Sequence, residues 1–349
     1  MRMFPILGVS MRWLALLVLG STVAIGCSPQ NDSGSGDEPL IVYSSRNDQL
    51  IRPVFERYEE ATGETVRYLT DSDGALIARL EAEGAQTPAD VLMTVDAGNL
   101  WRAAELDLLQ PLDSEIVASA IPASYRDSKD RWTALSLRAR TIVYSTERVE
   151  PEQLSTYAAL ADDRWADRLC LRTSKKVYNQ SLVASMIERV GAERTEAIVE
   201  GWVANLAQPP FANDTAVVEA IVAGDCDVGI VNSYYFGRLE KERPEIPVAL
   251  YWANQGEGES GTHVNVSGAG VTRHADHPER ARALIEWLSQ GEAQALFAEL
   301  NMEFPANPEM PAAERVRAWG DFRADDMPIE RAGALQRQAV QLMDRAGYR

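Results

Sequence analysis

Histidine and cysteine are scarce in this sequence, and their scarcity limits the chemistry that the chain offers. The 349 residues include 3 histidines and 3 cysteines, with no C-x-x-C pair and no Cys/His cluster at metal-ligand spacing. This argues against a structural zinc site. The sequence also contains no G-x-S-x-G elbow, no H-E-x-x-H motif and no phosphate-binding P-loop. The patterns of a serine hydrolase, a zinc protease and a P-loop nucleotidase are therefore missing.

Positive charge is also in the minority. Lys and Arg number 34 against 52 Asp and Glu, which gives a net charge of −18. Binding to DNA or RNA requires clustered cations, so we expect no nucleic-acid partner. The same surplus of acidic groups is compatible with the capture of a cation. The length of the chain is enough for about two domains, each with its own core.

Long apolar runs are missing as well. The apolar run at 13–25 follows Arg2 and Arg12, and it is shorter than the ~20 residues that a membrane-spanning helix needs. It ends in the small residues before Cys27, as in a bacterial lipoprotein signal peptide. We therefore expect 1–26 to be a signal peptide, Cys27 to carry a lipid anchored in a bacterial membrane, and 27–39 to be a flexible tether. A plain secretory peptide with an incidental cysteine is the alternative; both place the protein in the periplasm or another extracytoplasmic compartment.

Two further cysteines remain when Cys27 is assigned to a lipid. Cys170 and Cys226 are 56 positions apart. In an oxidising compartment two cysteines favour one disulfide, and two buried free thiols are the other interpretation.

Alternating strand and helix signals open the body of the chain. The sequence predicts strands at 40–44, 65–69 and 91–95, a helix that begins near Ile51 and stops at Gly63, and a second helix at 75–83. This β-α-β-α-β order predicts an α/β fold with a mostly parallel sheet that helices cover on both faces. Its ligands should bind at the carboxyl ends of the strands.

A second α/β unit is predicted from about residue 137. We expect strands at 141–145, 228–231 and 263–271, and helices within 180–190, 193–206, 215–223, from 234, 278–289 and 329–345. Two α/β units with a cleft between them are the resulting architecture.

Tyrosines stand where such a fold places its ligands. Tyr234 and Tyr235 follow the predicted strand at 228–231, and Tyr144 lies near the end of the strand at 141–145. Phenolate is a hard oxygen donor that suits a small ion of high charge, and ferric iron can supply the energy of deprotonating a phenol with an ordinary pKa near 10. Core packing or sugar stacking by these aromatic residues is the other interpretation. His274 and His277 could share a metal, but their setting before Pro278 is typical of a helix N-terminal turn.

Several segments, in order along the chain, resemble the periplasmic ferric-iron-binding proteins, which are the substrate-binding components of iron ABC importers. These segments are YSSR (43–46), PADVLMTVDAGNLWRAAELDLLQPL (88–112), LRARTIVYS (137–145), CLRTSKKVYNQSL (170–182), GDCDVGIVNSYYFGRL (224–239) and NVSGAGV (265–271). The resemblance implies a transferrin-like, type II periplasmic binding protein fold. The N-terminal lobe would comprise 40–136 plus about 262–308, and the C-terminal lobe 137–261 plus about 309–349.

The same resemblance implies the site and the partners. Tyr144, Tyr234 and Tyr235 would hold Fe(III), together with a synergistic anion such as carbonate. Arg138 and Arg140 would steady the phenolates or hold the anion, with Arg46 and Asn47 as further polar neighbours of the site. It also favours pairing of Cys170 with Cys226. The resemblance implies a monomeric protein that delivers iron to an ABC permease and its ATPase. It implies a binding protein and not an enzyme.

One departure affects the predicted ligand set. After YSSR, tyrosine-rich members of this family often continue with His-Tyr as further ligands, whereas this chain has Asn47-Asp48. Asp48 offers a carboxylate as a fourth ligand and Asn47 only a neutral carbonyl, which leaves the choice of Fe(III) over Fe(II) open.

Three other functions remain open from the sequence. The same fold could bind an organic or phosphorus-containing anion through Arg138, Arg140 and helix N-termini. An enzyme could use Asp48 or Asp96 as a base, and a sensory subunit could present its closed form to a membrane receptor.

Overall fold

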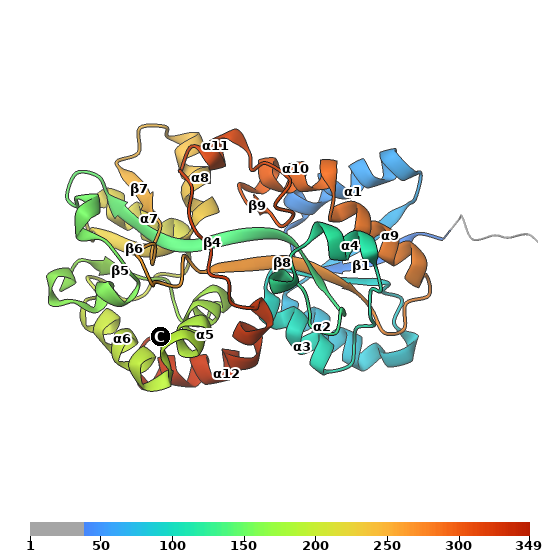
Figure 1. Cartoon of the computed structure of the whole chain (residues 1–349), viewed down its shortest axis with the longest axis horizontal. Coiled ribbons are helices and arrows are strands. Elements are labelled where there is room, and N and C mark those ends of the chain that lie inside the picture. Colours follow the sequence, from blue (N-terminus) through green and yellow to red (C-terminus); the bar gives the residue numbers. More distant parts are fainter. Residues whose placement is uncertain (1–37) are drawn as a thin grey trace, which may run out of the picture. The chain divides into compact units, whose positions relative to one another are not determined.

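The computed structural model describes residues 38–349 (Figure 1). The predicted signal peptide, the predicted lipidation site Cys27 and most of the predicted tether lie outside the described residues.

The described chain alternates between strands and helices. The strands are β1 (Leu40–Ser44), β2 (Val66–Thr70), β3 (Val91–Thr94), β4 (Thr133–Ser145), β5 (Leu169–Cys170), β6 (Val228–Asn232), β7 (Val248–Tyr251), β8 (Val264–Val271) and β9 (Phe304–Pro305). The helices are α1 (Asp48–Thr62), α2 (Asp73–Glu83), α3 (Ala97–Glu105), α4 (Glu115–Ala120), α5 (Val177–Val190), α6 (Ala192–Ala204), α7 (Asp214–Ala223), α8 (Ser233–Glu242), α9 (Pro278–Leu288), α10 (Gly291–Asn301), α11 (Glu314–Arg317) and α12 (Ile329–Arg345).

Local sequence explains where several of these helices begin and end. Ser72 and Asn213 cap the N-termini of α2 and α7 by accepting hydrogen bonds from backbone N–H groups. Gly63 ends α1 and Gly224 ends α7 in the left-handed conformation, with φ of 78° and 86°. Pro53 lies inside α1, at the sixth residue of the helix and therefore beyond its first turn.

The strands form one connected arrangement in the order β2-β1-β3-β8-β4-β6-β5, with β7 and β9 also paired to β4. Strands β1, β2 and β3 are parallel, as are β5 and β6. The long strand β4 pairs antiparallel with β8 through Thr133–Ala139 and then with β6 from Arg140 onwards. Figure 1 shows β4 and β8 running side by side through the middle of the described chain.

Two sets of buried apolar side chains lie on either side of this crossing. The first surrounds β1–β3 and includes Phe55, Leu100 and Trp132; the second surrounds β5–β7 and includes Trp165, Trp202 and Val217. We call the elements around the first set the N-terminal lobe and those around the second the C-terminal lobe. The α/β fold predicted from the sequence is confirmed.

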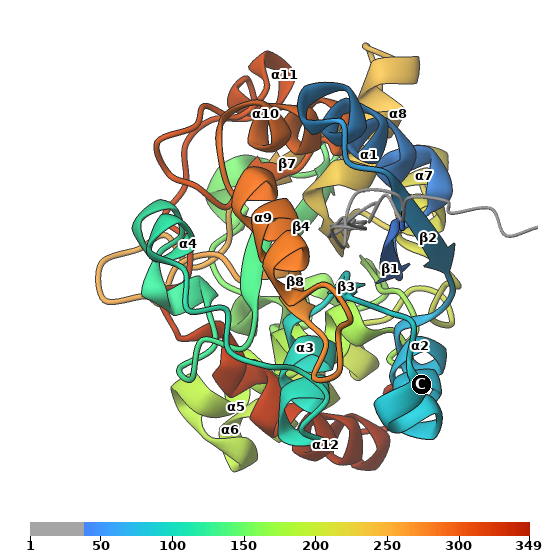
Figure 2. The ribbon, with the colours of Figure 1, turned by 90° about the vertical axis from the view of Figure 1, so that its right-hand side faces the viewer.

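Helices cover both faces of each sheet (Figures 1 and 2). In the N-terminal lobe, α1 and α10 lie on one face and α2 and α3 on the other. In the C-terminal lobe, α7 and α8 lie on one face and α5, α6 and α12 on the other. Helix α12 packs against α5 of the C-terminal lobe and also against α3 of the N-terminal lobe.

Cys170 and Cys226 are joined in a disulfide between the end of β5 and the turn before β6, with their Cα atoms 5.9 Å apart.

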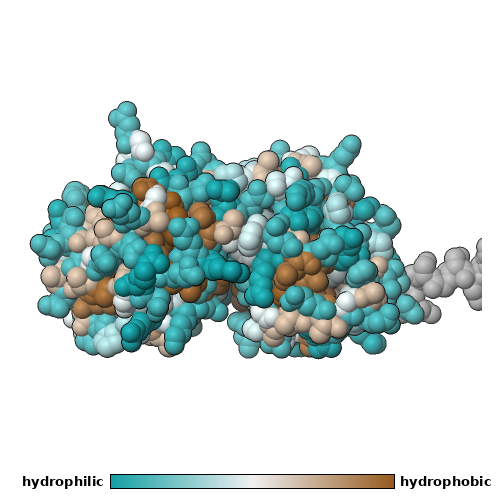
Figure 3. Space-filling view, turned by 90° about the horizontal axis from the view of Figure 1, so that it is seen from below, coloured by the Kyte–Doolittle hydropathy of each residue, from teal (hydrophilic) through white to brown (hydrophobic). Residues whose placement is uncertain are grey.

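None of the helices in residues 38–349 combines the length and the apolar character required to cross a membrane. Seen from below, the described surface is mainly hydrophilic, and its apolar residues form separate patches (Figure 3).

Candidate functional site: a cluster of buried tyrosines

Two parallel strands of the C-terminal lobe lead to the same edge of their sheet. Strands β5 and β6 are parallel neighbours, so their carboxyl ends lie together. Helix α5 begins shortly after β5, and helix α8 begins directly after β6. Tyr178 is the second residue of α5, and Tyr234 and Tyr235 are the second and third residues of α8. Three phenols are thus carried by the first turns of two adjacent helices.

These three residues, which we call the tyrosine cluster, are in contact. The phenol oxygens of Tyr234 and Tyr178 lie 3.3 Å apart, and Tyr234 donates to Tyr178. The rings of Tyr234 and Tyr235 are 4.4 Å apart between centroids. Only 8% of Tyr178 and 6% of Tyr234 is exposed, so the phenol oxygens are largely removed from solvent.

Cationic side chains surround the cluster. The guanidinium groups of Arg138 and Arg172 both lie 5.3 Å from the ring centroid of Tyr178. Arg238 lies 4.9 Å from the ring centroid of Tyr234 and 5.8 Å from that of Tyr235. Such positions favour negative charge on the rings and their oxygens.

In the absence of a bound cation Tyr178 and Tyr234 hold their protons. Burial, with the neighbouring phenols Tyr178 and Tyr235, raises the pKa of Tyr234 well above its usual range. Burial likewise raises the pKa of Tyr178, and the nearby charge of Arg138 opposes this effect. A ligand that needs these oxygens as phenolates must therefore displace their protons.

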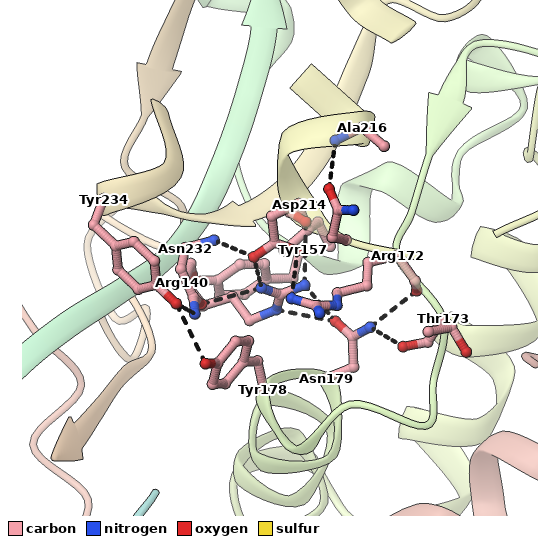
Figure 4. A network of polar contacts seen from close by, with 12 residues as sticks. Arg140, Tyr157, Arg172, Thr173, Tyr178, Asn179, Asp214, Ala216, Asn232 and Tyr234 are labelled. Carbon is pink, nitrogen blue, oxygen red and sulfur yellow. Dashed lines mark hydrogen bonds and ion pairs between the residues drawn. The ribbon is translucent and has the colours of Figure 1, made fainter. Parts of the chain in front are cut away.

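A buried hydrogen-bond network lies beside Tyr178 and Tyr234 (Figure 4). Arg140, 1% exposed, donates to Asn179, Asp214, Asn232 and the carbonyl of Ile230. The side chain of Asn232 in turn donates to the phenol oxygen of Tyr234 at 3.4 Å.

The same network fixes the loop before α5. The amide of Asn179 donates to the carbonyls of Arg172 and Thr173, at 3.0 Å each, and to the phenol oxygen of Tyr348 at 2.7 Å. The network therefore links the residues that precede and follow Tyr178 to the end of β6.

The structure does not bring Tyr144 to the tyrosine cluster. Because β4 and β6 are antiparallel, Tyr144 lies opposite Val228 at the start of β6, whereas Tyr234 follows the end of that strand. The four residues from Arg140 to Tyr144 correspond to about 13 Å of strand. Tyr144 packs instead in the core of the C-terminal lobe, among residues such as Val149 and Leu154. Burial raises its pKa, and so do the charges of Glu152 and Glu150.

The two arginines of the LRAR segment differ in their surroundings. Arg138 faces Tyr178 and donates to Ser267 and to the carbonyl of Val266, while its Nε has no hydrogen-bond partner. Arg140 contacts none of the three tyrosines through a hydrogen bond within residues 38–349, because its donors are directed at the supporting network.

The N-terminal lobe holds the remaining predicted residues. Asp48, in the first turn of α1, is paired with Arg52 and accepts a hydrogen bond from the phenol of Tyr68 at 2.7 Å. Tyr68 and Arg52 lower the pKa of this carboxyl group. Asn47 is the exposed N-cap of α1, and its side chain makes no capping hydrogen bond. Among the described residues no hydrogen bond joins Asp48 to the tyrosine cluster.

Arg46 and Asp96 connect different parts of the molecule. Arg46 forms a buried ion pair with Glu303, 2.6 Å apart, and donates to Ser136 of β4. Asp96, at the start of α3, is buried and accepts hydrogen bonds from Asn265 of β8 and from Ser181 of α5. Asp96 therefore joins the N-terminal lobe to the helix that carries Tyr178, and burial raises its pKa while Arg138 and Ser181 oppose this.

A separate cavity of about 640 Å³ opens on the C-terminal lobe beside Ser185, Arg189 and His263. None of the predicted ligands lines it.

Within residues 38–349, no group of three or more His, Cys, Asp and Glu side chains is placed to hold a metal ion. His277 occupies the N-cap position of α9 without a capping hydrogen bond from its side chain, in the helix N-terminal turn that the sequence indicated.

Sequence reasoning missed Tyr178, Arg172 and Arg238 as members of the site. The signal for Tyr178 was present, because it opens the helix that follows the short strand at 169–170. This strand is only two residues long, and its pairing with β6 is a long-range contact that no local pattern in the sequence reveals.

Comparisons with known proteins agree with this architecture. Iron uptake protein A1 of Synechocystis is 38% identical over 344 residues, which cover 95% of either chain. The major ferric iron-binding protein of Neisseria meningitidis is 22% identical, with coverage of 89% of this chain and 93% of its own. The structure of the Trichodesmium protein IdiA (FutA) with iron and citrate ligands superposes with a TM-score of 0.85 at 40% identity, and covers 89% of this chain and 100% of its own.

The resemblance drawn from the sequence segments is confirmed by these relatives. Residues 54–324 match the model of a single family, described as bacterial extracellular solute-binding protein. With this match over most of its length and with relatives at 38–40% identity, the chain belongs to the family of bacterial extracellular solute-binding proteins.

Proposed function

We propose that this protein binds ferric iron outside the cytoplasm and delivers it to an ABC-type permease. The observation that carries this proposal is the tyrosine cluster, in which three phenols from two helix N-termini meet among three guanidinium groups. Relatives named for iron uptake and for ferric iron binding support it. Iron is the cargo of the protein and not a resident cofactor.

The chemistry of the site favours a trivalent cation. Each phenol is a hard oxygen donor once its proton is lost, and Fe(III) supplies the energy for that loss. Three phenolates would balance the three positive charges of Fe(III). The guanidinium groups of Arg138, Arg172 and Arg238 then leave the site with surplus positive charge, which an added anion would balance.

Arg172 is the residue best placed to hold that anion. It is buried beside Tyr178 and Tyr235, and its Nε and Nη1 make no hydrogen bond, although Nη1 lies 3.6 Å from Asp214 Oδ1 in an ion pair. Buried donors without partners are unfavourable, and an anion such as carbonate or citrate would satisfy them. The free Nε of Arg138 would provide a further donor. The Trichodesmium relative, solved with iron and citrate, supports this assignment.

The ligand set we propose is Tyr178, Tyr234 and Tyr235, with Asp48 as a fourth ligand from the N-terminal lobe. Asp48 would have to exchange its hydrogen bond from Tyr68 for the metal. Tyr144 is left out because its strand register places it in the core.

Closure of the lobes would shield the bound iron, and opening at the permease would release it. The lobe boundaries that we propose follow the sequence assignment at about 136/137, 261/262 and 308/309. They fall close to the point where β4 changes its partner strand between Ala139 and Arg140.

Anchoring completes the proposed role. We expect removal of residues 1–26 and attachment of a lipid to Cys27, which would keep a monomeric protein at the membrane near its permease and ATPase. Metabolic labelling with a tagged fatty acid, compared between the wild type and Cys27→Ala, tests the lipid directly.

The function is tested by titrating the metal-free protein with ferric citrate and recording visible absorption. We expect a saturable tyrosinate-to-iron charge-transfer band at one equivalent of iron. The double variant Tyr234→Phe/Tyr235→Phe should lose this band while its circular dichroism stays native. If the folded wild type gives no band, the ligand is not tyrosinate-bound Fe(III), and the proposal fails in favour of an anion or a different metal state.

A further inference from the structure

Arg140 has no hydrogen-bond donor left for a ligand. A guanidinium group has five N–H donors. Nε donates to Asn179, Nη1 to Asp214 and Asn232, and Nη2 to Asn179 and to the carbonyl of Ile230, which uses all five. The side chain is 1% exposed. This full set of partners separates it from Arg172, whose Nε and Nη1 make no hydrogen bond, with Nη1 lying 3.6 Å from Asp214 Oδ1 in an ion pair.

The partners of Arg140 reach the tyrosine cluster along two routes. By donating to the amide oxygen of Asn232 at 3.0 Å, Arg140 turns the amide nitrogen of Asn232 toward the phenol oxygen of Tyr234, 3.4 Å away. By donating to the amide oxygen of Asn179, it turns that amide nitrogen toward the carbonyls of Arg172 and Thr173. The first route directs an N–H donor at a ligand oxygen, and the second fixes the loop that leads to Tyr178.

The carboxylate of Asp214 is shared between two guanidinium groups, since Oδ2 pairs with Arg140 and Oδ1 lies 3.6 Å from Nη1 of Arg172. Its Oδ2 accepts from Arg140 Nη1 and from the backbone N–H of Asn232, at 3.1 Å each. Asp214 has no exposed surface. Asp214 therefore holds the guanidinium group of Arg140 in the network while it also contacts Arg172.

We infer that Arg140 is a positioning residue, which sets the orientation of the Asn232 amide and thereby the geometry of the tyrosine cluster without touching the metal. This inference rests on the proposed function, because the readout is bound iron. Partners one step removed from a metal change its affinity by about 10–100-fold when they are replaced. We expect a change of that size from loss of the Arg140 contacts.

The experiment compares Arg140→Lys, Asn232→Ala and the control Arg168→Lys by ferric citrate titration. Lysine keeps the charge of Arg140 but lacks the planar fork that two amide oxygens require. Arg168 pairs with Asp227 at the opposite end of β6 at 2.6 Å, so the same arginine-to-lysine change there perturbs an ion pair of the same lobe away from the tyrosines. We expect Arg140→Lys and Asn232→Ala to weaken iron binding ~10–100-fold and to shift the charge-transfer band, with Arg168→Lys unchanged.

The outcomes are distinguishable. If the wild type gives the band and both Arg140→Lys and Asn232→Ala match it in affinity and wavelength, the positioning role is overturned. An equal effect of Arg168→Lys would also overturn it, since the change would then report general destabilisation. If Arg140→Lys does not fold, Asn232→Ala decides alone, because it leaves Arg140 and Asp214 paired. Absence of a band in the wild type rejects the proposed function instead.

Discussion

Tyr178 and Tyr144 form a natural pair for testing the site, because each is a largely buried phenol and only one reaches the cluster. Phenylalanine removes the oxygen and keeps the ring. Outer-shell partners of a metal are worth about 10–100-fold in affinity, so we expect Tyr178→Phe, which removes a ligand oxygen, to weaken iron binding at least ~10-fold. Tyr144→Phe should bind iron as the wild type does. Competition with a chelator measures both, and a larger loss in Tyr144→Phe would restore Tyr144 to the ligand set.

His263 illustrates how burial controls a single ionisable group. Burial lowers its pKa to about 3, with the charges of Arg140 and Arg138 acting in the same direction. The unfolded chain therefore takes up this proton at a higher pH than the folded chain. Between pH 6.5 and 3, stability is lost as the pH falls, by about 1.4 kcal/mol per pH unit from this group. At higher pH the group adds no dependence.

The variant His263→Gln removes this titration. We expect the free energy of unfolding of the wild type to decrease more steeply than that of the variant between pH 6.5 and 4.5. Urea denaturation at several pH values measures both slopes. Parallel pH profiles would show that His263 is not the group responsible.

At the residue scale, the sequence predicted two of the three residues of the tyrosine cluster. Tyr234 and Tyr235 were predicted because a strand and the following helix are adjacent along the chain. Tyr178 was not singled out and Tyr144 was chosen in its place, because the register between β4 and β6 decides which phenol reaches the end of β6. Register depends on pairing between distant segments, and the local pattern of one strand carries no information about it.

Close packing of α12 on α3 depends on a glycine. A Cβ atom at Gly333 would lie 2.8 Å from Cβ of Trp101 and 3.2 Å from Cα of Gly98, too close for the two helices to stay in place. We expect Gly333→Ala to destabilise the protein by about 1–3 kcal/mol. Gly74 in α2 has nothing within 4 Å of such a Cβ, so Gly74→Ala should be neutral or stabilising by up to about 1 kcal/mol. Thermal unfolding of both variants tests this, and equal stability would contradict the packing argument.

Many elements followed from local pattern, but β5, β7, β9, α3, α4, α10 and α11 were not predicted, and β4 was predicted too short. The predicted helix at 329–345 matches α12, and the helix ends at Gly63 and Gly224 are also confirmed. Strand β4 extends from Thr133, although the sequence indicated a strand only from 141. The part of β4 before residue 141 carries Arg138 and Arg140, whose charges hide the strand pattern. These side chains are buried only because other segments supply partners for them.

For the whole molecule, the raised pKa values of the phenols predict that iron uptake depends strongly on pH. Burial, together with the neighbouring phenols, keeps Tyr178 and Tyr234 protonated near neutral pH. Binding as phenolates releases at least two protons per iron, so the apparent affinity should fall at least ~100-fold for each unit by which the pH is lowered. Chelator competition at pH 6, 7 and 8, corrected for protonation of the chelator, measures this slope. A slope below one proton per iron would mean that the phenols bind without ionising.

The shared strand β4 has a consequence for any attempt to dissect the protein. Residues 133–139 of β4 complete the sheet of one lobe and residues 140–145 complete that of the other. A gene fragment cut at this point would encode two halves that each lack part of a strand between its neighbours, with unpaired edges open to aggregation. Neither lobe can therefore be expressed as a faithful half of the protein. The smallest unit worth producing for structural or binding work contains both.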